Sequence, residues 1–200
     1  LSPTAFRKSN PNKYSKISTI ESKNGQEKEP FEQYICNSIN HQNWIKMKAK
    51  IEIKEMPQLE LAFITQIGHI GMDNTYAKLI KWAAPKGLLQ NEKLKVVTIY
   101  HDSFKITEPE KVRMSACISL NQKVEVSGEI GLTTIEKGKC IVGHFEIALN
   151  EFEKSWISLF IWMNENGYKK AERNPYEVYY NDFNEHPQKT SIVDFCIPIE

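Results

Sequence analysis

The sequence predicts an α+β fold in which duplicated strand-helix-strand-strand units form one curved antiparallel sheet with two helices and a central cleft. The main sign is an internal repeat: TYAKLIKWAAPKG at 75–87 matches SWISLFIWMNENG at 155–167. Further along, Ala116-Cys117-Ile118 matches Phe195-Cys196-Ile197. Two copies are too few for an open repeat array, so they indicate a duplicated domain with pseudo-two-fold symmetry. The seam between the copies is then a natural ligand site.

The first copy contains two strands, a helix and two further strands. KIEIKEM at 50–56 alternates apolar and polar residues, which is typical of a half-buried strand, and Pro57 ends it. A second strand at 59–68 closes on a glycine. The spacing of Tyr76, Leu79 and Ala83 gives the next segment one apolar helical face. Strands at 95–102 and 113–120 complete the unit.

The second copy repeats this order. The segment 129–145 is expected to form a hairpin with Lys137 and Gly138 at its turn. Strands at 176–182 and 191–199 end the chain. The helix between the hairpin and these strands carries its apolar residues on one face: Phe152, Trp156, Leu159, Phe160 and Met163. Because each half alone buries little surface, joining both into one sheet supplies a workable core and covers exposed edges.

Composition excludes several classes of function. The net charge is +1 over 200 residues, so nothing in the overall charge favours binding to nucleic acid or to a membrane surface. No apolar run approaches the roughly 20 residues of a spanning helix. The four cysteines lack metal-ligand spacing and are expected to be buried in a cytoplasmic protein. No nucleophile elbow, phosphate-binding loop or dinucleotide motif occurs, and we expect no metal, cofactor or catalytic residue.

Glu177 is the most unusual residue, since it lies between aromatic residues in the apolar strand YEVYY. A carboxylate in such a strand is costly unless it is paired or meets a cation. It could be an acidic anchor at the bottom of an aromatic pocket, or a solvated residue, or the partner of a Lys or Arg. Thr98 holds the matching position in the first copy, so the acid occurs once. Trp156 is either a core residue of its helix or a wall of the cleft. His144 and Glu146 form a weaker candidate for acid/base chemistry.

Several segments resemble the GyrI-like small-molecule-binding domain, the effector-binding module of AraC-type and multidrug-sensing transcription regulators. They are IEIKEMPQLELAFITQIGHIG, LIKWAAPKGLL, YHDSFKITEPEKVRMSACISL, GEIGLTTIEKGKCIVGHF and YEVYYND. The resemblance implies a ligand cleft in which Glu177 binds a cationic or polar organic molecule beside Trp156. It also implies an aromatic wall that includes Tyr100, Phe145 and Tyr179.

The first residues, LSPTAFRKSNP, resemble the end of an AraC-type helix-turn-helix domain. We therefore expect residues 1–48 to be the end of a DNA-binding domain plus a linker, and residues 49–200 to be the effector-binding domain. The less polar segment 31–44 is expected to pack on that domain. DNA would be contacted only through a helix-turn-helix domain that this chain lacks, and a homodimer is open.

The leading hypothesis is a non-enzymatic ligand sensor of a transcription regulator, binding a small cationic, aromatic or amphipathic effector. One alternative is a hydrolase of small reactive electrophiles with Glu177 as general base. Another is a protein-binding inhibitor module, which predicts a closed cleft and an exposed apolar patch elsewhere.

Overall fold

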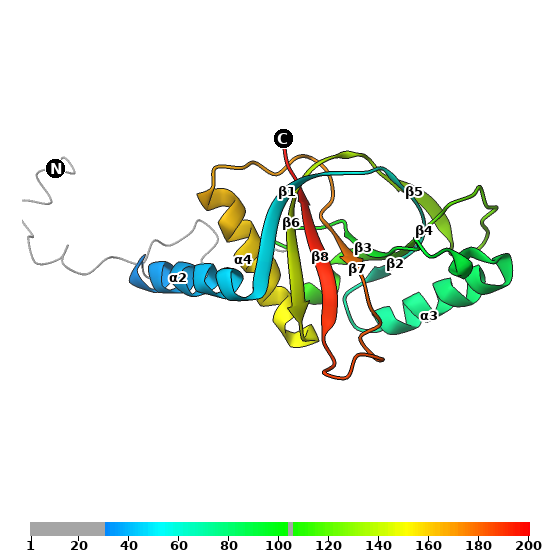
Figure 1. Ribbon diagram of the computed structural model, residues 1–200, viewed down its shortest axis with the longest axis horizontal. Coiled ribbons are helices and arrows are strands. Elements are labelled where there is room, and N and C mark those ends of the chain that lie inside the picture. Colours follow the sequence, from blue (N-terminus) through cyan, green and yellow to red (C-terminus); the bar gives the residue numbers. More distant parts are fainter. Residues whose placement is uncertain (1–30, 104–105) are drawn as a thin grey trace, which may run out of the picture.

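The computed structural model describes residues 31–103 and 106–200, and the helix-turn-helix resemblance at the chain start lies outside them. Its core is one eight-stranded antiparallel sheet with the order β1-β6-β8-β7-β3-β4-β2-β5 (Figure 1). The strands are β1 (Ala49–Met56), β2 (Leu59–Ile67), β3 (Val96–Tyr100), β4 (Arg113–Ser119), β5 (Gly131–Ile135), β6 (Gly138–Ile147), β7 (Tyr176–Tyr179) and β8 (Ser191–Pro198). The longer helices are α2 (Phe31–Lys48), α3 (Met72–Ala83) and α4 (Phe152–Glu165).

The predicted duplication is visible in the sheet. One unit is β2-α3-β3-β4 and the other is β6-α4-β7-β8, and the strand order of one unit mirrors that of the other. The units meet where β3 pairs with β7, and at this seam Thr98 lies directly opposite Glu177. The repeat therefore brings these two equivalent residues together on the pseudo-two-fold axis.

The expected hairpin at Lys137 and Gly138 is wrong. β5 pairs with β2, whereas β6 pairs with β1, and the register stays unbroken between them. Met56 pairs with Gly138, and three residues on, Leu59 pairs with Ile135. The long ribbon β1-β2 thus runs antiparallel to the long ribbon β5-β6. Together they arch over the sheet and join its two halves (Figure 1).

The arch defines two faces of the sheet. Under it, on what we call the inner face, apolar side chains of both units and of the arch form one core, which includes Leu61, Val97, Val178 and Cys196. The opposite, outer face is covered by α3 and α4, each with its own core. Because side chains alternate along a strand, neighbouring residues of β3 and β7 contact different cores.

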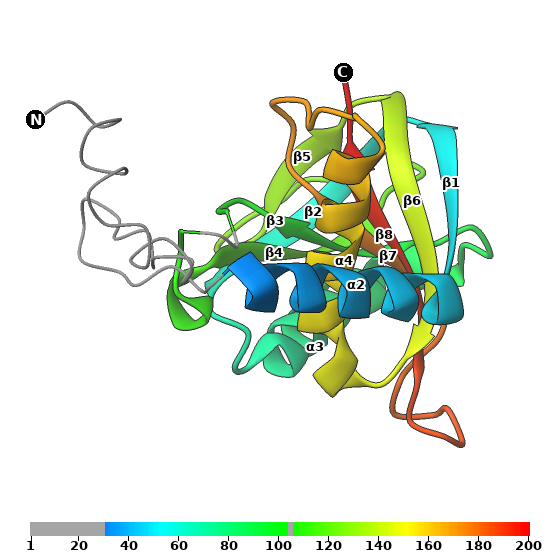
Figure 2. The same cartoon turned by 90° about the vertical axis from the view of Figure 1, so that its left-hand side faces the viewer.

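Residues 31–48, which the sequence analysis placed in a linker, form helix α2 in the structure. α2 runs directly into β1 and lies across α4 (Figure 2). Within 31–44, His41 Nδ1 lies 2.8 Å from Ser158 Oγ and the Trp44 indole N–H donates to Ser155 Oγ. Ile45, the next residue, is 2% exposed and belongs to the same core as Trp156. The expected packing of the segment 31–44 on the domain is therefore confirmed at His41 and Trp44.

Candidate functional site

Glu177 lies in the middle of β7 and has no exposed surface. Its neighbours Tyr176 and Val178 contact the inner core, so Glu177 and Tyr179 point to the outer face, toward α4. The alternating pattern of the strand thus places a single carboxylate between the sheet and a helix, away from water.

Three neutral donors bind the two oxygens of Glu177. The Tyr100 hydroxyl and the Trp156 indole N–H donate to Oε1 over 2.8 and 2.7 Å. The Tyr179 hydroxyl donates to Oε2 over 2.5 Å. These donors come from β3, α4 and β7, so the carboxylate is held by both units at once.

Burial dominates the electrostatics of this group. It raises the pKa of Glu177, and the hydrogen bonds from Tyr179, Trp156 and Tyr100 act in the opposite direction. The ion pairs between described residues all lie elsewhere and none includes Glu177. Among the described residues, Glu177 therefore does not pair with a Lys or Arg, which was one of the alternatives for this residue. Burial, followed by the nearby Glu177 charge, raises the pKa of Tyr100 and of Tyr179 as well.

The two units build this site from equivalent residues. Tyr76 of α3 occupies the place of Trp156, and its hydroxyl is 2.8 Å from Thr98 Oγ1, just as the indole of Trp156 contacts Glu177. The tyrosines that end β3 and β7 each reach the other unit's central residue. Tyr100 binds Glu177, and the Tyr179 hydroxyl lies 3.2 Å from Thr98 Oγ1. The residues around Thr98 and Glu177 are thus equivalent in the two units, and the units differ in that Glu177 can carry a charge and Thr98 cannot.

Aromatic rings close the site. Trp156 stacks on Phe195 with 4.5 Å between ring centroids, and Tyr100 meets its indole edge-on at 5.6 Å. Phe152 stacks on Tyr179. Glu177 and Trp156 are buried, whereas Tyr100, Tyr179 and Phe152 are half-buried residues. The phenol groups of the two tyrosines are themselves buried at the carboxylate.

The structure brings together four of the five predicted site residues, namely Glu177, Trp156, Tyr100 and Tyr179. Phe145 is not among the residues that touch the carboxylate. It is fully buried and packs against Phe195, one layer behind the indole. Tyr76 and Thr98 were missed as site residues, although their alignment with Trp156 and Glu177 was the signal that could have identified them.

His144 does not pair with Glu146 as an acid/base couple. Its Nδ1 lies 2.7 Å from Oδ1 of Asp194, a buried residue of β8. Within the described residues, no group of three His, Cys, Asp or Glu side chains could hold a metal ion. None of the helices described is long and apolar enough to cross a membrane.

Residues 49–200 match the family model of the GyrI-like small molecule binding domain, and the chain belongs to this family. No curated protein matches it. The C-terminal domain of EcmrR has a similar structure, with a TM-score of 0.63 and 19% identity over 76% of this chain and 98% of that one. EcmrR in a complex with DNA also has a TM-score of 0.63 and 19% identity, over 83% of this chain. The chain spans 65% of that EcmrR chain.

Two further structures share the fold at lower identity. SAV2435, solved with bound tetraphenylphosphonium, has a TM-score of 0.51 and 10% identity over 76% of this chain and 94% of that one. A hydrolase encoded by lin2189 from Listeria innocua has a TM-score of 0.54 and 12% identity over 76% and 93%. At these identities the likeness establishes the fold alone.

Proposed function

We propose that this chain is the ligand-sensing part of a transcription regulator and that Glu177 binds a small lipophilic cation. One observation carries the proposal: the Glu177 carboxylate is fully buried, is held by three neutral donors, and takes part in none of the ion pairs between described residues. An uncompensated buried charge is expensive, so a cationic ligand that reaches it gains an electrostatic partner.

The surrounding residues favour a cation that also has an apolar or aromatic surface. Trp156, Tyr100 and Tyr179 offer ring faces and edges around the carboxylate, and aromatic faces attract cations. Similarity to SAV2435, which binds tetraphenylphosphonium, supports the same class of ligand. Similarity to EcmrR, solved with DNA, supports a regulator as the parent protein. DNA contact is proposed for a helix-turn-helix domain of that parent.

Binding requires the site to open, because Glu177 has no exposed surface in this structure. The side chains of the half-buried residues Tyr100, Tyr179 and Phe152 are the groups whose rotation would uncover it. An open cleft therefore stays a prediction for the liganded form. A ligand that binds the open form better than the closed form shifts the population toward it.

Helix α2 supplies a route from the site to the preceding part of the chain. Trp156 on α4 contacts Glu177, while Ser155 and Ser158 of the same helix bind α2. Each serine hydroxyl donates to the carbonyl four residues earlier in the chain, so its oxygen accepts from Trp44 or His41. A displacement of α4 by ligand would therefore be passed to α2.

The experiment is calorimetric titration of the chain with tetraphenylphosphonium. We expect binding, and we expect Glu177→Gln to weaken it by a factor of about ten or more, equal to about 1.4 kcal/mol. Glu146→Gln, which removes an exposed carboxylate of β6, is the matched control and should bind like the wild type. Equal affinity of the Glu177→Gln variant and the wild type would remove Glu177 from the site.

A hydrolase is the second candidate, because the raised pKa of buried Glu177 suits a general base and a structural neighbour is a hydrolase. Glu177 would take a proton from water as that water attacks an epoxide carbon. The ring C–O bond at that carbon breaks, and the proton held by Glu177 then neutralises the alkoxide, which gives a diol. The test is turnover of an epoxide by the wild type and by Glu177→Gln. Turnover that disappears in the variant would favour this function over sensing.

A further inference from the structure

The two tyrosines that bind Glu177 both occupy strand ends. Tyr100 is the last residue of β3 and Tyr179 is the last residue of β7. Chain ends of an element open locally more readily than its centre. Past each tyrosine one further backbone hydrogen bond of 2.9 Å continues the ladder, from His101 to the Arg113 carbonyl and from Tyr180 to the Ile192 carbonyl. The positions of both phenols therefore depend on what fixes the chain immediately after each tyrosine.

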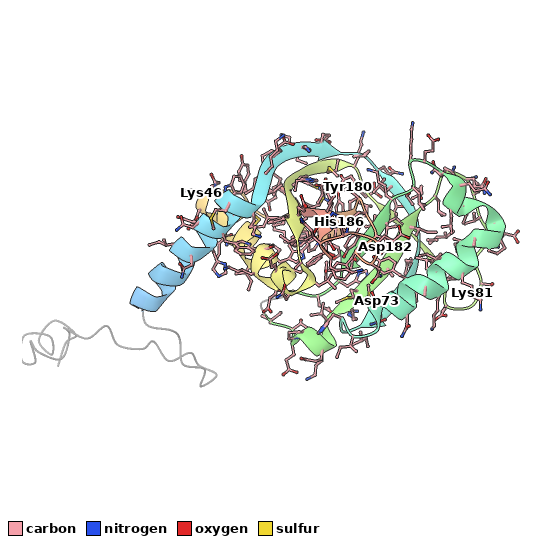
Figure 3. The ribbon with its side chains drawn as sticks, turned by 60° about the horizontal axis from the view of Figure 1, so that its bottom comes forward. Lys46, Asp73, Lys81, Tyr180, Asp182 and His186 are labelled. Atoms are coloured by element: carbon pink, nitrogen blue, oxygen red, sulfur yellow. The ribbon has the colours of Figure 1, made fainter. Side chains whose placement is uncertain are left out.

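The residue after each tyrosine is anchored on the inner face. His101 Nε2 lies 2.8 Å from Ser115 Oγ, which in turn lies 2.9 Å from Thr65 Oγ1. The Tyr180 hydroxyl donates over 2.6 Å to Asp194 Oδ2. In the view of Figure 3 Tyr180 is seen against the ring of strands with Asp182 and His186 of the β7–β8 loop in front of it, whereas Asp73 and Lys81 lie on α3.

These anchors are equivalent in the two repeats. Shifting each residue of the first triad by 79 positions carries Thr65, His101 and Ser115 onto His144, Tyr180 and Asp194, since Tyr100 and Tyr179 are also 79 positions apart. The hydrogen bond from His144 to Asp194 then corresponds to the one between Thr65 and Ser115.

The equivalence extends to the second residue after each strand. The backbone N–H of Arg113 donates to Asp102 Oδ2 over 2.7 Å, and that of Ile192 donates to Asn181 Oδ1 over 2.7 Å. The segments Tyr-His-Asp at 100–102 and Tyr-Tyr-Asn at 179–181 therefore make the same three kinds of contact. The first residue contacts the carboxylate, the second is fixed on the inner face, and the third is fixed to the next strand.

We propose that His101 and Tyr180 are positioning residues for the Glu177 site. Each fixes from the inner face a strand end that presents a phenol to the carboxylate on the outer face. Neither contacts Glu177, and their effect on a ligand passes through Tyr100 and Tyr179. The effect on ligand affinity rests on the proposed function, whereas the effect on Glu177 itself does not.

The test removes the Tyr180 hydroxyl and then restores a donor. Tyr180→Phe should fold, since Tyr180 is 56% exposed and keeps its ring. In this variant Tyr179 is less well held on Glu177. Because a hydrogen bond to a carboxylate lowers its pKa, we expect carbon NMR to find the pKa of Glu177 higher than in the wild type. Tyr180→His places the donor of the first repeat opposite Asp194 and should return the pKa toward the wild-type value.

Tyr168→Phe is the control, because Tyr168 is a partly exposed tyrosine that stacks on Trp162 of α4. It should leave the Glu177 titration unchanged, because it removes a tyrosine hydroxyl that does not bind Asp194. His101→Phe makes the equivalent change in the first repeat and should raise the pKa of Glu177 through Tyr100. An identical Glu177 titration in the wild type, Tyr180→Phe and His101→Phe overturns the proposal.

Calorimetry with tetraphenylphosphonium adds the functional readout. We expect Tyr180→Phe to weaken binding about fivefold, the size of one net hydrogen bond, and Tyr180→His to recover most of it. Unchanged affinity in Tyr180→Phe would contradict a role in ligand binding. If the wild type itself does not bind this probe, the proposed function fails in that respect, and the Glu177 titration still decides the positioning role.

Discussion

Thr98 and Glu177 are cross-strand partners at equivalent positions of the two repeats, and only Glu177 is ionisable. The same frame of tyrosines and an aromatic helix residue surrounds both. Duplication therefore supplied two sets of donors, whereas substitution placed the acid in one of them. A ligand on the pseudo-two-fold axis would be surrounded by equivalent groups of both repeats and would find a single acid, Glu177. This arrangement fits one ligand site per chain.

The pH dependence of stability should report the burial of Glu177. Its folded-state pKa is raised, so the folded state binds more protons than the unfolded state above the unfolded pKa of about 4.3. The stabilising contribution is present below that pH and is lost as pH rises through the folded-state pKa. We therefore expect urea unfolding to show the wild type losing stability relative to Glu177→Gln as pH rises from 4.5 toward 8. A stability difference that is flat across this range would contradict the raised pKa.

Trp156→Phe should destabilise the protein mainly by removing the hydrogen bond to Glu177 and less by changing the packing of the core. Phenylalanine keeps an aromatic ring to stack on Phe195 but cannot donate to Glu177. At pH 8 we expect a loss of about 1.5–3 kcal/mol in the free energy of unfolding, the size of a hydrogen bond to a charged group. Trp162→Phe, on the same helix but stacked on Tyr168, is the control. Equal losses in both variants at pH 8 would indicate packing rather than the indole N–H as the cause.

Much of the fold and part of the site were predictable because both follow from local patterns. The repeat, with its alternating strand and helix periods, identified the two units, and the acid among aromatics identified Glu177. The hairpin at Lys137 and Gly138 failed because a turn-like dipeptide does not determine which strands pair, and here β5 and β6 both pair with the β1-β2 ribbon. Strand alternation places Phe145 in the same core as Trp156 but does not say how far from the seam it lies, so its place in the aromatic wall stays a prediction.

Tyr76→Phe tests whether the uncharged half of the frame contributes to the stability of the fold. The Tyr76 hydroxyl donates to the Val97 carbonyl over 2.9 Å and lies beside Thr98, so removing it leaves a buried carbonyl with one partner fewer. We expect a loss of about 1 kcal/mol in the free energy of unfolding. Because no charge is involved, this loss should be the same at pH 5 and pH 8, unlike that of Trp156→Phe. A pH-dependent loss in Tyr76→Phe would mean that Tyr76 acts on Glu177 rather than on Thr98.

Hydrogen exchange of α2 should respond to ligand if α4 passes on its displacement. His41 and Trp44 donate to Ser158 and Ser155, on either side of Trp156 along α4. We expect tetraphenylphosphonium to change amide exchange in α2 of the wild type, and we expect a much smaller change in the double variant His41→Ala, Trp44→Phe. Its affinity for the cation should stay within about twofold, since neither residue reaches the Glu177 carboxylate.

Lys46→Ala is the matched control, because Lys46 is exposed on α2 and lies away from the ring of strands (Figure 3). It should keep the full exchange response. The double variant separates binding from signalling, because it removes the two α2–α4 hydrogen bonds and leaves the groups that bind Glu177 in place. A ligand response of α2 that survives loss of both hydrogen bonds would place the coupling in the apolar contact of Ile45 with the α4 core instead.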